Sequence, residues 1–374
     1  MSEKEKFLVR DVFNEAGIKR MASAIKKSYP EFKSNKFVKE TAGKFPELSF
    51  IQRSDHITEM LRKYLPDDFP RSAAILLDSL GPAIPQNDLK GFGGFIVWPM
   101  TIYISRYGLE YFDISMNALY EMTKRFSAES AIRYFLIRYP EKTLKVLEKW
   151  ASDSNPHIRR LVSEGSRPRL PWAVRLQQFV KDPAPVIRLL EKLKEDPELY
   201  VRRSVANNVN DIAKDHPDRA AALLIKWNKS KNAGTKWIVQ HASRTLVKAG
   251  HTDILSALGF DNDVEISVDK LKLNKPAVHF GETLTFSFSV KNNSKSAVNL
   301  MIDYIIHHRK ANGGTMPKVF KLAKKKIPAH GEILLQKNHP IREISTRKYY
   351  PGEHIVEIQI NGKKYLQKKF ELVM

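Results

Sequence analysis

The sequence predicts a multi-domain chain in which an all-α solenoid of helical repeats is followed by an all-β sandwich. Up to about residue 260, apolar residues recur at the helical spacings i, i+3, i+4 and i+7, and polar breakers separate the segments. From Val264 onward the period changes to two, and turn signals such as KNNS, NGG and ING separate the segments. We therefore expect a helical domain over residues 1–260 and a β domain over residues 264–374.

The helical part repeats itself, and this is the strongest structural signal in the sequence. Three segments share a proline, a leucine and a lysine in register, and they alternate with three segments that begin with basic residues. The first set is YPEKTLKVLEKW (139–150), DPAPVIRLLEKL (182–193) and HPDRAAALLIKW (216–227), and the second is HIRRLVSEGS from 157, YVRRSVANNV from 200 and TKWIVQHASR from 235. Each unit therefore predicts a helical hairpin, and stacked hairpins of this kind form a HEAT-like solenoid.

The β part predicts a sandwich of about seven strands. Segments such as ETLTFSFSV and EHIVEIQI alternate apolar and polar residues, so each has one face for a core and one for solvent.

Composition favours a nucleic acid as the partner. The chain has 374 residues, of which 42% are hydrophobic, and its 63 Lys and Arg against 41 Asp and Glu give a net charge of +22. Such an excess of positive charge favours a polyanion as the binding partner. The chain contains no cysteine, which excludes disulfide scaffolds, thiolate zinc sites and cysteine nucleophiles.

Membrane and metal signals are absent from the sequence. The N-terminal segment carries charges throughout, and the most apolar stretch, from Phe95 to Ile104, contains Pro99 and is too short to span a bilayer. The histidines show no metal-binding spacing. We expect a cytoplasmic, bacterial protein that acts at the nucleoid as a monomer and uses no membrane, metal or cofactor.

Basic residues recur at one phase of the repeat. Arginine pairs open the second helix of two units and a lysine takes their place in the third, namely Arg159 and Arg160, Arg202 and Arg203, and Lys236. Residues at one phase lie on the same part of successive units, so they predict a basic stripe that binds DNA. The alternative is that they are ordinary solvated helix termini.

A second basic segment lies in the β part. KLAKKKIPAHG (321–331) predicts a hairpin loop whose Lys324, Lys325 and Lys326 contact a phosphate backbone. The alternative is that these lysines protect an edge strand from pairing with another chain.

The run SEGSRPRLPWA (163–173) interrupts the repeat. Two prolines prevent it from continuing as a helix, so it predicts an inserted loop that carries Arg167, Arg169 and Trp172. Irregular segments of a solenoid often carry its function. The alternative is a rigid loop whose tryptophan only plugs the solenoid.

This run, together with YVRRSVANNVNDIAKDHPD and KWIVQHASRTLVKAGH, resembles the AlkC branch of the HEAT-like-repeat alkylpurine DNA glycosylases, the AlkC/AlkD superfamily of DNA alkylation repair proteins. The resemblance covers about residues 5–260, and the β part is similar in architecture to the immunoglobulin-like domain of some AlkC members. It implies a base excision repair enzyme that hydrolyses the N-glycosidic bond of cationic alkylated bases, 3-methyladenine and also 3-methylcytosine. The implied partner is double-stranded DNA containing such bases, which are not flipped into a pocket.

The resemblance also implies the site residues. The family's catalytic cleft maps onto Glu129, Arg160, Glu164, Trp172 and Asp211, and His241 of the third motif is expected to contact DNA. No lysine stands out as a Schiff-base nucleophile, so we expect a monofunctional glycosylase without lyase activity.

These residue types also fit the chemistry. A cationic base is a good leaving group, so the barrier lies in the oxocarbenium-like sugar and in the delivery of water. Glu164 or Glu129 can stabilise that charge and orient the water. Arg160 can hold a phosphate, and Trp172 can pack on the sugar or base. The structural alternatives are a helix first-turn acid for Glu129 and a partner of the arginine pairs for Asp211.

Two other functions stay open from the sequence. A non-catalytic HEAT-like module that grips nucleic acid has the same charge, and a protein-binding scaffold has the same repeats. Release of free base from alkylated DNA distinguishes the enzyme from both.

Overall fold

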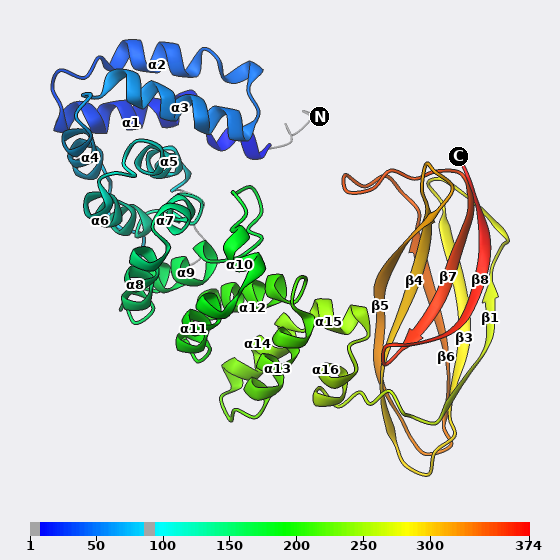
Figure 1. Cartoon of the computed structure of the whole chain (residues 1–374). Helices are drawn as coiled ribbons and strands as arrows, with labels where there is room; N and C mark the ends of the chain where they lie inside the picture. Colours follow the sequence, from blue (N-terminus) through cyan, green and yellow to red (C-terminus); the bar gives the residue numbers. More distant parts are fainter. Residues whose placement is uncertain (1–7, 86–93) are drawn as a thin grey trace. The chain divides into compact units, whose positions relative to one another are not determined.

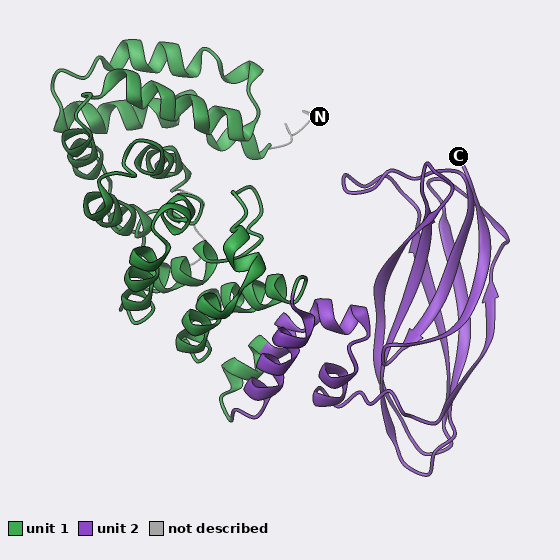
Figure 2. Ribbon diagram, in the orientation of Figure 1, with its two compact units in different colours: residues 1–215, 231–238 green, residues 216–230, 239–374 purple. Residues whose placement is uncertain are grey.

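The computed structural model describes residues 8–85 and 94–374. Helices give way to strands between Ala257 and Ile266 (Figure 1). The chain forms two compact units, Met1–Asp215 with Lys231–Ile238 and His216–Ser230 with Val239–Met374 (Figure 2). The predicted fold class, all-α repeats followed by an all-β sandwich, is confirmed.

Two of the N-terminal helices begin at a residue whose side chain caps them. The N-terminal helices are α1 (Glu15–Ser28), α2 (Ser34–Ala42), α3 (Phe50–Tyr64), α4 (Phe69–Asp78), α5 (Trp98–Tyr107), α6 (Phe112–Thr123) and α7 (Ile132–Arg138), with 3-10 turns at Val9–Val12, Phe45–Glu47 and Phe95–Val97. The Asn14 side chain accepts from the Gly17 amide at the start of α1, and Asp68 accepts from the Arg71 amide at the start of α4. These contacts satisfy amides that have no partner within the helix.

The two sets of repeat motifs form alternating helices. These are α8 (Pro140–Trp150), α9 (Pro156–Gly165), α10 (Gln177–Lys181), α11 (Ala184–Leu193), α12 (Leu199–Ile212), α13 (Pro217–Asn228), α14 (Ala233–Ala242), α15 (Arg244–Ala249) and α16 (Thr252–Ala257). Helices α8 and α11 contact each other, as do α9 and α12, and each of α8 and α11 also contacts the helix that follows its motif. The repeats therefore stack as two layers, with α9 and α12 in the second layer (Figure 1).

The predicted interruption of the repeat is present after α9. That helix ends at Gly165, and no helix resumes until Gln177. The Leu176 amide donates to the Pro168 carbonyl at 3.2 Å, which closes the intervening segment into a loop. Below we call residues 166–174 the inserted loop.

The sandwich consists of two sheets. Its strands are β1 (Ile266–Leu273), β2 (Ala277–His279), β3 (Thr283–Asn292), β4 (Val298–Arg309), β5 (Thr315–Ile327), β6 (Glu332–Pro340), β7 (Gly352–Ile360) and β8 (Lys363–Val373). One sheet has the order β1-β3-β6 and the other β2-β8-β7-β4-β5, and only β2 and β8 pair in parallel.

Alternation along the strands builds the core of the sandwich. Alternate residues of β3 and β4 belong to one buried apolar cluster, namely Leu284, Phe286, Phe288 and Val290 on β3 and Leu300, Ile302, Tyr304 and Ile306 on β4. Residues two apart point to the same face of a sheet, so these two sets meet between the sheets.

The last helices pack on the sandwich within the second compact unit. The Asn361 side-chain amide donates to the Asp261 carbonyl at 2.6 Å, and Gln359 donates to the Lys248 carbonyl at 3.4 Å. Gly250 and Gly362, with φ of +76° and +82°, approach so closely that a Cβ on either would meet the other's backbone within 2.9 Å. The boundary between the two compact units therefore lies within the helical part of the chain, and not at the point where helices give way to strands.

The lysine-rich segment of the β part needs a correction. Lys324, Lys325 and Lys326 lie in strand β5, at the edge of the larger sheet, and only the residues from Pro328 to Gly331 form the turn. The predicted hairpin loop is therefore wrong, because residues 323–327 pair with β4 and Ile327 is buried in the core of the sandwich. Lysines on an edge strand also oppose pairing with other chains, which was the alternative interpretation.

None of the described helices is both long and apolar enough to cross a bilayer.

Candidate active site on the repeat helices

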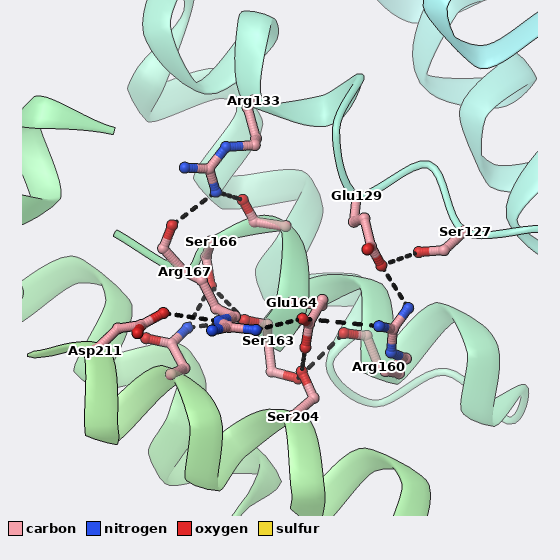
Figure 3. Close-up of polar contacts among 12 residues, drawn as sticks. Ser127, Glu129, Arg133, Arg160, Ser163, Glu164, Ser166, Arg167, Ser204 and Asp211 are labelled. Atoms are coloured by element: carbon pink, nitrogen blue, oxygen red, sulfur yellow. Dashed lines mark hydrogen bonds and ion pairs between the residues drawn. The ribbon is translucent and has the colours of Figure 1, made fainter. Parts of the chain in front are cut away.

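Glu164 lies at the centre of a buried ion-pair network in the first compact unit (Figure 3). It belongs to α9 and is 5% exposed. Its Oε1 is 2.6 Å from Arg167 Nη1 and 3.7 Å from Arg160 Nη2. Ser204 of α12 donates to the other oxygen at 2.5 Å. Both carboxylate oxygens are therefore engaged.

Opposite effects act on the pKa of Glu164. Burial raises this pKa, but the charges of Arg160 and Arg167 and the hydrogen bond from Ser204 outweigh burial and hold the pKa below its ordinary value. The carboxylate is therefore ionised at neutral pH despite its burial.

Arg167 joins Glu164 to a second carboxylate. Its Nε donates to Asp211 Oδ2 of α12 at 2.8 Å, and Lys214 donates to the other Asp211 oxygen at 2.8 Å. Asp211 is 1% exposed and Arg167 is 9% exposed. Arg167 was predicted to contact DNA, but the structure turns its guanidinium inward, between two carboxylates.

Glu129 approaches the network from the segment before α7. Its Oε2 is 2.5 Å from Arg160 Nη1 and accepts from Ser127 at 2.7 Å. Arg160 also lies over the Tyr200 ring, with 5.2 Å between its Cζ and the ring centroid. Burial lowers the pKa of Arg160, but Glu129 and Glu164 more than compensate and raise it. Arg160 therefore links the more exposed Glu129 to the buried Glu164.

Trp172 is an exposed aromatic residue of the inserted loop. It is 71% exposed and has a φ of +58°, which is unusual for a residue other than glycine. Its ring lies 5.7 Å from the Phe50 ring of α3. Beside it is a cavity of about 150 Å³ whose wall includes Trp98, Tyr134 and Trp172. The tryptophan therefore does not plug the solenoid.

The predicted basic stripe divides into inward and outward residues. Arg159 pairs with Asp196 at 2.6 Å and donates to the Asp153 and Ser154 carbonyls, six and five residues earlier in the chain. Arg202 makes the matching contacts in its own repeat, with the carbonyls of Asp196 and Pro197. The first arginine of each pair therefore fixes the loop between two helices of the repeat, a role that repeat phase alone did not reveal.

The remaining predicted DNA-binding residues vary in exposure. Arg203, Lys236, Lys324, Lys325 and Lys326 are exposed, and His241 is half-buried. Arg169 pairs with Asp215 at 2.7 Å through its Nε. Lys324 also lies over the Phe260 ring, with 5.1 Å between its Nζ and the ring centroid. The exposed residues are the ones most available to a phosphate backbone.

Four of the five residues that the resemblance implied for catalysis lie in one connected network, and Trp172 stands on the adjoining loop. Sequence reasoning missed Ser204, Tyr200 and Arg133, which contact this network or the loop. Ser204 directly follows the second arginine pair, a position that could have drawn attention to it. Arg133 had no such signal, because its contacts are all to backbone.

The comparisons with known proteins agree with this fold. Residues 267–374 match the family model described as the C-terminal Ig-like domain of the uncharacterised protein YhaZ. The chain is 35% identical over 355 residues to "Uncharacterized protein YhaZ" of Bacillus subtilis (strain 168), covering 95% of this chain and 96% of that protein.

A solved structure is similar over the full length. It is the Pseudomonas fluorescens alkylpurine DNA glycosylase AlkC bound to DNA containing an abasic site analog, with a TM-score of 0.90 and 36% identity. The match covers 98% of this chain and 100% of that chain. The chain therefore belongs to the YhaZ family, in the AlkC branch of HEAT-like-repeat proteins that carry a C-terminal immunoglobulin-like domain.

Proposed function

We propose that the chain is a DNA glycosylase that removes alkylated bases by hydrolysis of the N-glycosidic bond. The observation that carries the proposal is a set of three carboxylates, Glu129, Glu164 and Asp211, that arginines hold in one network, followed in the chain by the loop that exposes Trp172. The full-length similarity to a structure of AlkC bound to DNA supports it, and so does the net charge of +22.

The preferred substrates would be cationic bases in double-stranded DNA, 3-methyladenine and 3-methylcytosine. Such a base leaves as a neutral molecule, and positive charge develops on the deoxyribose as the C1′–N bond breaks. A preorganised carboxylate stabilises this charge without having to reorganise, which is worth about 10²–10³ in rate for one such group. The rate for an uncharged alkylated base gains less, because such a base would leave as an anion unless it is protonated first.

The two glutamates would differ in their roles. Both oxygens of Glu164 are engaged, so it would act through its negative charge. Glu129 is more exposed and receives its described contacts at Oε2 alone, which leaves Oε1 to orient the attacking water. Trp172 would pack on the sugar or base, where an aromatic face stabilises positive charge.

No nucleobase pocket is required by this scheme. The base could stay in the duplex while the carboxylates act on the sugar from the outside, in contrast to enzymes that flip the base. The exposed lysines and arginines would hold the backbone, which accounts for affinity without sequence preference.

Base release tests the proposal. Duplex DNA treated with a methylating agent is incubated with the full chain, and the released bases are identified by mass, with untreated DNA and a Glu129→Gln, Glu164→Gln double variant as controls. We expect 3-methyladenine and 3-methylcytosine from the wild type alone. Binding of the DNA with no base released would instead support a non-catalytic nucleic-acid-binding module.

A further inference from the structure

Arg133 is a fully buried arginine beside the proposed site. It lies on α7, is 0% exposed, and forms no ion pair among its described contacts (Figure 3). A charge buried without a counter-ion is costly, and this cost is tolerated only where hydrogen bonds or function require the charge. Arg133 therefore calls for an explanation that hydrophobic packing does not provide.

Every described hydrogen bond of Arg133 goes to a backbone carbonyl. Its Nη1 donates to the carbonyls of Gly165 at 3.0 Å and Arg167 at 2.6 Å, and its Nε donates to that of Val174 at 2.6 Å. A longer contact of 3.5 Å reaches the Pro168 carbonyl. One guanidinium thus binds the end of α9 and both ends of the inserted loop.

These contacts fix the two functional residues that the loop carries. Arg167 is held through its own carbonyl while its guanidinium bridges Glu164 and Asp211. Trp172 lies between the two bound ends of the loop and has a left-handed backbone. Such a conformation is strained for a residue other than glycine and persists only where the surroundings enforce it.

The positive charge of Arg133 is also stabilised by its surroundings at the end of α9. Burial lowers the pKa of Arg133 to about 10, which still leaves it protonated at neutral pH. Its cation lies at the carbonyl end of α9, where a helix favours positive charge. The three carboxylates of the network stabilise it at longer range.

We propose that Arg133 is a positioning residue that sets the inserted loop, and through it Trp172 and Arg167, for the reaction. A planar guanidinium presents five donors in a rigid fork, whereas an ammonium presents three donors around a single nitrogen. Lysine at position 133 therefore keeps the charge but cannot bind both ends of the loop. The catalytic part of this inference rests on the proposed glycosylase function, and the structural part does not.

Arg53 offers a matched control. It is also buried, at 7% exposure, and donates to the carbonyls of Arg10, Phe13 and Phe45 at 2.9–3.0 Å. None of these carbonyls belongs to the inserted loop. Arg53 also pairs with Asp11 at 3.5 Å. Arg53→Lys therefore removes hydrogen bonds from a buried guanidinium to backbone carbonyls in the same compact unit, while the described contacts of Arg133 with the loop stay in place.

The test compares Arg133→Lys and Arg133→Met with Arg53→Lys in the full chain. The fluorescence of Trp172, obtained in each background as the difference from a Trp172→Phe variant, reports the loop by its emission wavelength and by quenching with acrylamide. Single-turnover and steady-state excision of 3-methyladenine report the reaction. Thermal unfolding reports the stability of each variant.

We expect both Arg133 variants to change the Trp172 emission and quenching and to lower kcat at least tenfold with little change in KM. Arg53→Lys should lower the unfolding temperature and leave both readouts as in the wild type. If Arg133→Met does not fold, Arg133→Lys, which keeps the charge, carries the test. An Arg133→Lys variant with wild-type Trp172 fluorescence and wild-type kcat would overturn the inference. If the wild type itself excises nothing, the proposed function fails, and the fluorescence still decides whether Arg133 sets the loop.

Discussion

The repeat helices and the sandwich bury ionisable groups in opposite ways. On α9 and α12, carboxylates and arginines are buried as pairs, with Glu164 and Asp211 both bound to Arg167. In the sandwich, burial instead disfavours the charged form: it lowers the pKa of His308 to about 3 and that of His339 to about 4, and it raises the pKa of Asp303 to about 6. The helical region therefore keeps its paired charges at neutral pH, whereas these histidines stay neutral.

The two regions therefore use positive charge for different purposes, the helices at a reaction site and the sandwich in binding. Paired, buried charges create a fixed field at one point, which is what a reaction that develops charge requires. The sandwich instead carries its charge outside, with 20 Lys and Arg against 9 Asp and Glu in residues 264–374, and exposed charges attract a polyanion at long range. We therefore expect changes in the helices to affect the reaction and changes in the sandwich to affect binding.

The largest expected effect is that of salt on DNA binding. If six or more phosphates are contacted, affinity should fall by about 10³ or more between about 50 and 200 mM salt. The measurement is a fluorescence-anisotropy titration of a labelled duplex at several salt concentrations. A nearly flat dependence would contradict a binding mode based on phosphates.

The next effect distinguishes the inward Arg167 from the outward Arg203. Arg167→Met leaves Glu164 and Asp211 without their shared partner, so excision should fall by about 10² and stability by up to about 3 kcal/mol. The salt slope should not change, because this guanidinium lies between two carboxylates. Arg203→Met should instead make the slope shallower by about one phosphate. If Arg167→Met makes the salt slope of DNA binding shallower and leaves the excision rate unchanged, Arg167 contacts a phosphate, as the sequence predicted.

A smaller effect is expected from the edge strand β5. Replacement of Lys324, Lys325 and Lys326 by serine should weaken DNA binding about tenfold and reduce the salt slope by up to about 3. Excision at saturating protein should be unchanged, because these residues lie in the sandwich. Affinity and slope equal to those of the wild type would show that the lysines serve only to protect the edge.

The smallest effect at neutral pH is on the stability of the sandwich. An unfolded histidine binds a proton near pH 6.5, whereas His308 and His339 bind one in the folded chain only near pH 3 and 4. Acid therefore favours unfolding, and stability should fall as the pH falls below about 6.5. Asp303 opposes this trend, because burial raises its pKa to about 6, but the two histidines outweigh it.

Hydrogen exchange checks this pH dependence. After correction for the intrinsic exchange rate, peptides from β4 and β6 should lose protection between pH 7 and pH 5, while those from α9 and α12 keep theirs. Equal loss in both regions, or none in the strands, would contradict the comparison.

The fold was predictable because its signals are local and periodic. The motifs that begin at Pro140, Pro183 and Pro217 repeat in register, and alternation along ETLTFSFSV marks β3. The lysine-rich strand was mistaken for a loop because KLAKKK lacks that alternation, and only pairing with β4 reveals it. Local patterns therefore predict elements well where apolar residues set the period.

The sequence was sufficient to predict the carboxylates of the candidate site, but not the direction in which its arginine side chains point. The resemblance implied Glu129, Glu164 and Asp211, but nothing in the run SRPRLPWA indicates that Arg167 turns inward. The contacts of Arg133 reach carbonyls 32 or more residues away. Since every residue has a carbonyl, such contacts leave no trace in the sequence.

The central claim is that the buried carboxylate network performs the reaction. Its most direct test is single-turnover excision of 3-methyladenine by Glu164→Gln, which removes the charge at nearly constant shape, with the rate expressed per folded molecule. We predict a rate about 10² below that of the wild type, or lower, together with binding to undamaged duplex that is unchanged within a factor of a few. A Glu164→Gln variant that excises the base at the wild-type rate would contradict the claim.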